Sequence, residues 1–175
     1  MKHDLRNKIL SVMSRCVDMT VATVRPDGAP QATIVSFAHD GLTLYFGCGA
    51  ASQKAANIAF DPRVSVTMAA PYRDWMAIEG LSMAAIATEV SVPAELEVVG
   101  RLMRERFPQI TQITGLEQAS ADDVKIFRLR PEIISVLDYS KGFGHSDLVK
   151  IGADDIGETL TSMRHHWLVA APAAT

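Results

Sequence analysis

Cysteine is scarce in this chain of 175 residues, since only Cys16 and Cys48 occur. Two isolated cysteines exclude a disulfide framework and a cysteine-rich zinc site, so we interpret both as reduced thiols. The sequence also has no apolar run near the ~20 residues that cross a bilayer. Its charged start, MKHDLRNKIL, lacks the apolar segment of a signal peptide. We therefore expect a cytoplasmic protein that does not enter a membrane.

An excess of positive charge is missing as well. The formal net charge is -3, and the 17 Lys and Arg residues are scattered along the chain. Because a nucleic-acid-binding domain normally gathers its basic residues on one surface, no nucleic-acid partner is expected. What the chain does contain is 48% hydrophobic residues, which is ample for one globular core at this length. Residues 1–175 are predicted to form a single domain that ends in a short helical tail over about 150–175, with a helix near Asp154–His166.

Short runs with a β pattern dominate the first half of the sequence. The runs MTVATV (19–24) and QATIVSF (31–37) flank the turn sequence RPDGAP and predict a hairpin. The run LTLYF (42–46) predicts a third strand that pairs beside the second. RVSVTMAA (63–70) alternates in the same way, and a long strand candidate extends from Trp75 to Val92, with Gly80 marking a bulge or bend.

Helical periodicity is confined to a few segments. Apolar residues recur at three-to-four spacing in Asp4–Arg15, in the run that follows Ser52, and in Pro93–Phe107. Two late strands are expected on either side of Pro131, over 124–130 and 132–140. Many short strands with few helices between them favour an antiparallel barrel over a doubly wound parallel sheet. The fold class is therefore mainly β with a few helices.

One lysine stands at an unfavourable place. In YFGCGAASQKAANIAF (45–60), Ser52 is a good helix N-cap, and Lys54 falls in the first helical turn. A cation there faces the positive end of the helix dipole, at a cost of about 0.3–1 kcal/mol. A bound phosphate or carboxylate would reverse that penalty, whereas a solvated lysine on a surface helix would simply tolerate it. Both interpretations stand on this stretch alone.

The order of the motifs supplies a further argument. The segments TVAT…DGAP, QATIVSF, LTLYF, SQKAANI, DPRVSV and WMAIEG follow one another between Thr20 and Gly80. This series resembles the FMN-binding split-barrel family typified by pyridoxamine 5'-phosphate oxidase. The resemblance implies an antiparallel split β-barrel of six to eight strands, an FMN cofactor, a homodimer with shared flavin sites and a small-molecule substrate.

The resemblance also implies which residues contact the cofactor. Ser52 and Lys54 would hold the FMN phosphate, with Gln53 between them. The strand QATIVSF would lie along the flavin, and Trp75 would reach the site from the dimer partner. The full set implied is Ala32, Thr33, Ile34, Val35, Phe46, Gly47, Ser52, Gln53, Lys54 and Trp75. No catalytic residue and no metal ligand is assigned.

Some residues expected of a true pyridoxamine 5'-phosphate oxidase are missing from this sequence. A true oxidase would carry an arginine at Gln31, a second basic residue at Gln53, and a basic, His-containing end that grips the substrate phosphate. The ending SVLDYSKGFGHSDLV instead resembles that of uncharacterised relatives and, more distantly, haem-degrading split-barrel proteins, in which a Gly-Phe-Gly stretch also follows a late strand. The leading hypothesis is an FMN-dependent oxidoreductase on an unidentified small molecule. The rivals are a haem-binding or haem-degrading protein and a non-catalytic flavin-binding module, and a deazaflavin in place of FMN remains open.

Four other side chains are of types that could take part in chemistry. His145 is either a pocket histidine or, as we favour, a loop histidine in a Gly-rich turn. Glu79 is interpreted as a structural carboxylate that bonds turn amides rather than a catalytic group. His165 and His166 are adjacent on a predicted helix and diverge by ~100°, which argues against a metal site.

Overall fold

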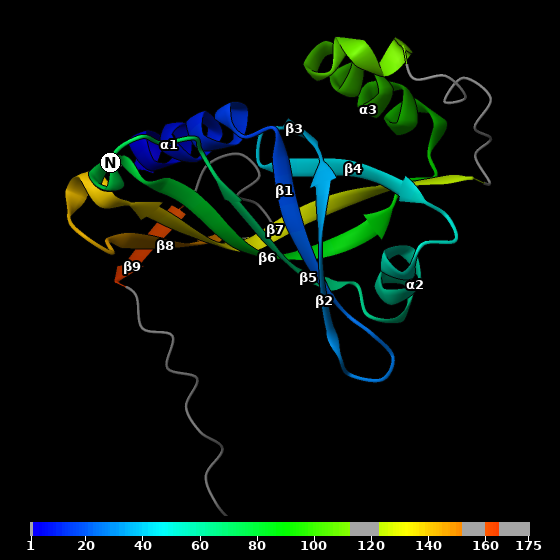
Figure 1. Cartoon of the computed structure of the whole chain (residues 1–175), viewed down its shortest axis with the longest axis horizontal. Coiled ribbons are helices and arrows are strands. Elements are labelled where there is room, and N and C mark those ends of the chain that lie inside the picture. Colours follow the sequence, from blue (N-terminus) through cyan, green and yellow to red (C-terminus); the bar gives the residue numbers. More distant parts are fainter. Residues whose placement is uncertain (1, 113–122, 152–159, 165–175) are drawn as a thin grey trace, which may run out of the picture.

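In the residues that the structure describes, an antiparallel sheet curls into a split barrel and is accompanied by three α-helices (Figure 1). The computed structural model describes residues 2–112, 123–151 and 160–164. In these ranges the strands are β1 (Asp18–Val24), β2 (Pro30–Ser36), β3 (Ala38–Asp40), β4 (Thr43–Gly49), β5 (Arg63–Ala69), β6 (Glu79–Glu89), β7 (Val124–Asp138), β8 (Ser146–Ile151) and β9 (Leu160–Arg164). The helices are α1 (Lys2–Arg15), α2 (Gln53–Phe60) and α3 (Pro93–Arg106).

Strand β7 holds the sheet together. The strand order is β2-β1-β5-β6-β7-β4-β3, and β8 pairs with both β7 and β9. β7 is 15 residues long and pairs with β6 along its length, with β4 at its first half and with β8 at its second. The two late strands expected around Pro131 are therefore one strand. Pro131 lies opposite Ala85, where the β6–β7 register shifts, so its missing N–H falls at an irregularity of the ladder.

The core lies between the curled sheet and α1. The apolar stripe expected on α1 is confirmed, since Ile9, Val12 and Met13 are fully buried. These side chains belong to the same hydrophobic core as Phe37, which lies between β2 and β3, and Leu129 of β7. In Figure 1, α1 lies over the sheet at one end, α3 stands above β4, and α2 lies near the opposite end, below β4. The helices thus cover separate parts of the sheet.

Several expectations about the strands are confirmed. β1 and β2 form the predicted hairpin, with Gly28 at φ 83° in its turn. β5 buries Val64, Val66 and Met68 on one face, as its alternation predicts. The helix that follows Ser52 and the helix that begins at Pro93 form as expected. The fold class inferred from the sequence is therefore correct, although the described residues contain nine strands.

Four further local expectations are wrong. Residues 43–46 belong to β4, which bonds to β3 and β7 rather than to β2, because the chain passes from β2 at one end of the strand order to β3 at the other. The long strand begins at Glu79, since Asp74 caps a short 3-10 helix, η1 (Trp75–Ala77). Gly80 marks a close approach, because a Cβ there would lie 3.0 Å from the Met68 carbonyl.

The fourth correction concerns the C-terminal tail. Residues 146–151 and 160–164 form β8 and β9, which pair with each other, so the chain returns as a hairpin rather than a helix in these ranges. Short apolar runs fit either a helix or a strand by periodicity alone, and pairing with the free edge of β8 decides the outcome. The remainder of the predicted tail, including His165 and His166, lies outside the described residues.

Candidate functional site

The loop between β4 and α2 is a tight turn that leads into a capped helix. The Ser52 amide donates to the Gly49 carbonyl at 3.0 Å, and the Ser52 hydroxyl accepts from the Ala55 amide at 3.3 Å. The predicted N-cap is therefore confirmed. In the first helical turn the amides of Gln53 and Lys54 have no acceptor within the helix. The start of α2 thus offers backbone donors and the positive end of the helix dipole to a ligand.

Lys54 is a buried cation at this helix start. The residue is only 9% exposed, and its Nζ lies 5.6 Å from the centroid of the Phe46 ring. Burial lowers the pKa of Lys54, and the neighbouring Cys48 thiol opposes that shift. Within the described part of the chain, no Asp or Glu forms an ion pair with Lys54. The interpretation of Lys54 as a solvated surface lysine is therefore wrong.

A buried amide, Asn57, fixes the position of α2. Its side chain donates to the Thr23 hydroxyl and to Gln31 Oε1, both at 2.9 Å, and accepts from Gln53 Nε2 at 2.8 Å. Asn57 is fully buried, so these bonds tie the helix to β1 and β2. The sequence analysis missed this residue, although Gln53 and Asn57 share the i, i+4 spacing of a helical side-chain pair. The side-chain amides of Gln31 and Gln53 are therefore both engaged by Asn57 and serve a structural role.

The four β2 residues implied as flavin contacts point to two faces. Val35 is 8% exposed and packs in the core, whereas Ile34 is 74% exposed. Ala32 is exposed on the face of Ile34, and Thr33 shares the inner face with Val35. Thr33 Oγ1 is buried and has no hydrogen-bond partner among the described residues. One ligand that contacts all four residues would have to reach around the strand or use its backbone.

Ile34 lines a groove on the outer face of the sheet. The groove has a volume of about 730 Å³. Ile34 and Leu137 are apolar members of its lining. Most of the other outward side chains carry small hydroxyl groups: Thr20, Thr67, Ser82, Ser135 and Ser146. The described lining residues come from strands and from the loop before β8, and none belongs to α2. The start of α2 and this groove are therefore separate features of one chain.

Phe46 and Gly47 lie within the packed barrel, where Phe46 packs through its ring and Gly47 lets two strands approach closely. Phe46 is completely buried and stacks on Phe127, with ring centroids 5.4 Å apart. Its ring forms the floor under Lys54 rather than a ligand-facing surface. Gly47 lies against β7, where a Cβ would come 3.1 Å from Ile126 Cδ1. Any cofactor contact by these two residues would thus use main-chain atoms or the space that the glycine leaves.

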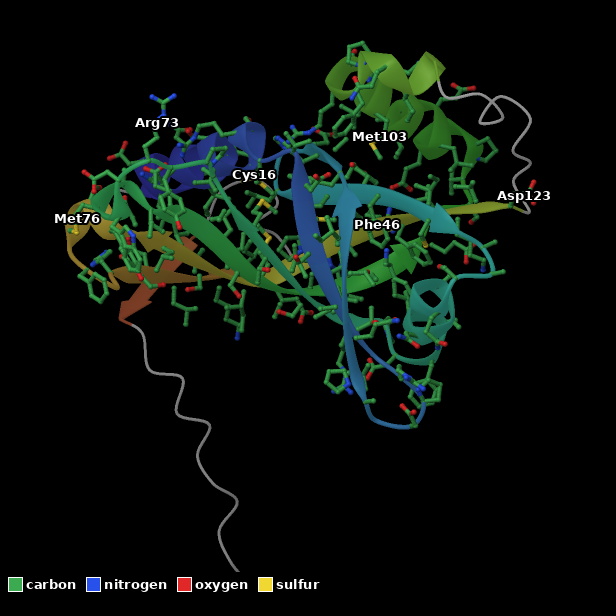
Figure 2. The ribbon with its side chains drawn as sticks, in the orientation of Figure 1. Cys16, Phe46, Arg73, Met76, Met103 and Asp123 are labelled. Atoms are coloured by element: carbon green, nitrogen blue, oxygen red, sulfur yellow. The ribbon has the colours of Figure 1, made fainter. Side chains whose placement is uncertain are left out.

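Trp75 does not join the other predicted site residues within one chain. It is 67% exposed and lies in η1, at the loop between β5 and β6. Figure 2 places Met76, its neighbour in the same short helix, at the end of the molecule opposite to α2. The structure therefore brings together Ser52, Gln53, Lys54 and Phe46, and leaves Trp75 on an exposed tip.

Glu79 and His145 have structural partners. Glu79 forms ion pairs with Lys8 and Arg15 of α1, so it bonds two cations rather than the expected turn amides. His145 Nε2 lies 3.3 Å from Asp147 Oδ2, and the His145 amide donates to the Gly142 carbonyl at 3.0 Å. Both observations favour structural roles, as the sequence analysis preferred.

No group of three or more His, Cys, Asp or Glu side chains in the described ranges is arranged to hold a metal ion. In the same ranges no helix has the length and apolar character needed to cross a membrane.

The structure is a small antiparallel barrel, and we call the start of α2, with Cys48, Ser52 and Lys54, the cradle. A family model described as pyridoxamine 5'-phosphate oxidase matches residues 5–138. The match covers most of the chain, and the protein belongs to that family. The family resemblance stated from the sequence is therefore confirmed. No curated protein matches the chain.

Solved structures with the same fold include proteins of different descriptions. A haem-binding protein from Mycobacterium smegmatis superimposes with a TM-score of 0.69 at 18% identity, over 83% of this chain and 57% of that protein. A conserved hypothetical protein from Mycobacterium tuberculosis superimposes with a TM-score of 0.66 at 26% identity, over 85% of this chain and 92% of that protein. The haem storage protein HutZ from Vibrio cholerae superimposes with a TM-score of 0.59 at 26% identity, over 75% of this chain and 89% of that protein. This chain thus spans little more than half of the first of these proteins.

Proposed function

We propose that this protein binds FMN as a homodimer and acts as a flavin-dependent oxidoreductase on a small molecule. The observation that carries the proposal is Lys54, a buried ammonium with no carboxylate partner among the described residues, at the start of a helix. A buried charge is costly unless an opposite charge compensates it. A phosphate group supplies that charge and accepts hydrogen bonds from the helix amides.

The donors around Lys54 fit a phosphate. Lys54 would form the charged contact, and the Gln53 and Lys54 amides would donate from the helix start. The Ser52 hydroxyl now donates only to the Cys48 sulfur at 3.5 Å, which is a weak acceptor, so a phosphate oxygen would be a better partner. The Thr33 hydroxyl on the inner face of β2 has no hydrogen-bond partner in the described part of the chain, so it is a further polar group that a ligand could satisfy.

The chain's own part in such chemistry is positioning and exclusion of water. A bound flavin supplies the transfer of electrons or hydride. Asn57 holds α2 against β1 and β2, so the phosphate cradle is fixed relative to the sheet. Phe46 keeps the space beneath Lys54 apolar, which strengthens the ion pair that an incoming phosphate would make.

The decisive experiment is FMN titration of Lys54→Met, which removes the charge and keeps an unbranched side chain over Phe46. Loss of a charged contact of about 1.5–3 kcal/mol predicts roughly 10- to 100-fold weaker binding. Lys150→Met, on the exposed side of β8, is the matched control and should bind as the wild type does. Inorganic phosphate should compete weakly with FMN for the wild type. Equal FMN affinity of the wild type and Lys54→Met would contradict the proposal.

Haem binding is the second candidate function. It is favoured by the two solved structures of the same fold that are described as haem-binding and haem storage proteins. His145 is a half-exposed imidazole in the loop before β8, where it would be the side chain to examine as a ligand. Addition of haemin to the purified protein separates the candidates. A Soret band that His145→Ala abolishes, together with no binding of FMN, would support haem in place of flavin.

A further inference from the structure

Cys48 lies in the anion cradle, a position that the sequence did not reveal. It follows Phe46 by two residues on β4, so both side chains share the face toward α2 and the core. The Ser52 hydroxyl donates to Cys48 Sγ at 3.5 Å. The Cys48 thiol also acts on the pKa of Lys54, opposing the effect of burial. A thiol, a hydroxyl and an ammonium thus meet at the start of one helix.

The second observation is the burial of Lys54 without an opposite charge beside it. This side chain is nine-tenths buried, and it lacks a carboxylate partner within the described residues. Attack by a cysteine on an oxidant proceeds through the thiolate, for which the Lys54 ammonium is the counter-ion at hand.

The other cysteine provides an internal comparison. Cys16 is 4% exposed at the end of α1, and burial raises its pKa against the weaker opposing effect of Arg15 and Arg106. Cys48 is only half-buried. Reactive cysteines are partly accessible and lie next to cations, whereas structural cysteines are buried and inert. Both cysteines have cationic neighbours, and they differ in accessibility: Cys48 is partly accessible, as reactive cysteines are, whereas Cys16 is buried.

We propose that Cys48 is a site of oxidation by hydrogen peroxide and that an anion bound at Lys54 protects it. The sulfur attacks one peroxide oxygen, an S–O bond forms and the O–O bond breaks. Hydroxide leaves and takes up the thiol proton to give water. The sulfur loses two electrons to become a sulfenic acid, and the peroxide is reduced.

This chemistry gives the site a regulatory property. The added oxygen would occupy the space between Ser52 and Lys54 that a phosphate oxygen needs, so oxidation of Cys48 and binding of a phosphate exclude each other. This coupling to FMN rests on the proposed function. The oxidation itself rests on the contact of Ser52 with Cys48 and on the buried Lys54 two residues after Ser52. Because a sulfenic acid is reduced by added thiol, the block is reversible.

The test measures sulfenic acid formation at each cysteine. The full-length protein is treated with hydrogen peroxide and a dimedone-type probe, and the labelled peptides of Cys48 and Cys16 are followed by mass spectrometry. Labelling of Cys48 should be several-fold faster than that of Cys16. Inorganic phosphate at constant ionic strength should slow the labelling of Cys48 several-fold. The substitution Lys54→Met should slow it by a similar factor. Added phosphate should then have no further effect on labelling in this variant. Cys48→Ser should lose this label, and Lys150→Met should behave as the wild type.

Each result bears on one of the two proposals. Equal labelling of the two cysteines, or unchanged Cys48 labelling in Lys54→Met or in phosphate, would overturn the oxidation proposal even if FMN binds normally. Lys54-dependent labelling that phosphate suppresses, in a protein that does not bind FMN, would support the oxidation proposal and overturn the proposed function. If both hold, peroxide-treated protein should bind FMN more weakly, and dithiothreitol should restore the affinity.

Discussion

The guanidinium of Arg106 lies over the ring of Phe37, with its central carbon 4.7 Å from the ring centroid. The same guanidinium donates to the Met13 carbonyl at 2.9 Å and to the Cys16 carbonyl, which are acceptors at the end of α1. A residue at the end of α3 therefore satisfies the last turn of α1 and covers a core aromatic. This contact joins two helices that are far apart in the sequence.

Replacing Arg106 should destabilise the protein. In Arg106→Met the two carbonyls lose a charged donor and the Phe37 ring loses its cation, so we expect a loss of about 2 kcal/mol in the free energy of unfolding. Urea denaturation followed by circular dichroism measures it. Arg104→Met, at an exposed position of the same helix, should change the free energy by less than about 0.5 kcal/mol. A similar small effect for both variants would show that Arg106 does not anchor α1.

Acid should weaken the attachment of α1 through Glu79. Burial alone would raise the pKa of Glu79, but hydrogen bonds from Lys8 and Arg15 outweigh it and hold the pKa below its ordinary value of 4.5. A carboxylate whose pKa is lower in the folded state contributes stability above pH 4.5, and this contribution is lost as the pH falls through the folded-state value.

Glu79→Gln checks this pH dependence. At pH 7 the variant should be less stable than the wild type, and the difference should shrink on acidification below pH 4.5. Urea midpoints between neutral and acidic pH give the comparison. Glu132→Gln, at an exposed position of β7, serves as the control. A stability difference that is independent of pH would mean that the ion pairs of Glu79 do not titrate as proposed.

FMN-loaded protein should not oxidise pyridoxamine 5'-phosphate at a useful rate. A phosphorylated substrate requires an anion site of its own, and such sites are usually built from converging Arg and Lys. Gln31 and Gln53 stand where the family pattern has basic residues, and both amides are engaged by Asn57. The assay follows pyridoxal 5'-phosphate and peroxide in the presence of oxygen. Sustained turnover would point to Arg73 or Lys141 as the phosphate ligand.

Trp75 should complete the flavin site of the partner chain. Trp75→Ala should weaken FMN binding although the residue lies far from Lys54 in its own chain. Mixing Trp75→Ala with Lys54→Met provides the test, because a mixed dimer then has one site with both side chains intact if Trp75 acts across the interface. Random exchange of two variants should restore about a quarter of the sites.

The outcome of this mixing distinguishes the arrangements. No restored site is expected if Trp75 acts within its own chain, because neither subunit then carries both intact residues. Sedimentation of the wild type at micromolar concentration should give a dimer. A monomer that still binds FMN would contradict the proposed assembly.

The sequence predicts those features that depend on local patterns. The N-cap at Ser52, the alternation in β5 and the buried stripe of α1 follow from spacing, and the structure has each of them. Lys54 could be singled out because a cation in the first turn of a helix conflicts with the dipole. Its burial could not be predicted, since it depends on how β4 places Phe46 beneath the helix.

Features that depend on distant segments escaped prediction. The partners of β4 and the continuity of β7 through Pro131 are set by pairing across the whole barrel. The bonds of Asn57 to Thr23 and Gln31 join three segments that no local pattern relates. Cys48 likewise gains its neighbours only after the turn brings Ser52 back over β4.

The position of β7 determines the order in which the protein can fold during synthesis. β7 joins two parts of the sheet, β2-β1-β5-β6 on one side and β4-β3 on the other, and it comes late in the sequence. Until it has left the ribosome, β4 has only the three-residue β3 as a hydrogen-bonded neighbour in the described fold. Nascent chains that end before β7 should therefore expose β4 and β6 as free edges and require chaperone protection. The cradle beside α2 rests on a strand, β4, that is fixed in the sheet only when β7 pairs with it, although the residues of the cradle are among the first third of the chain to be made.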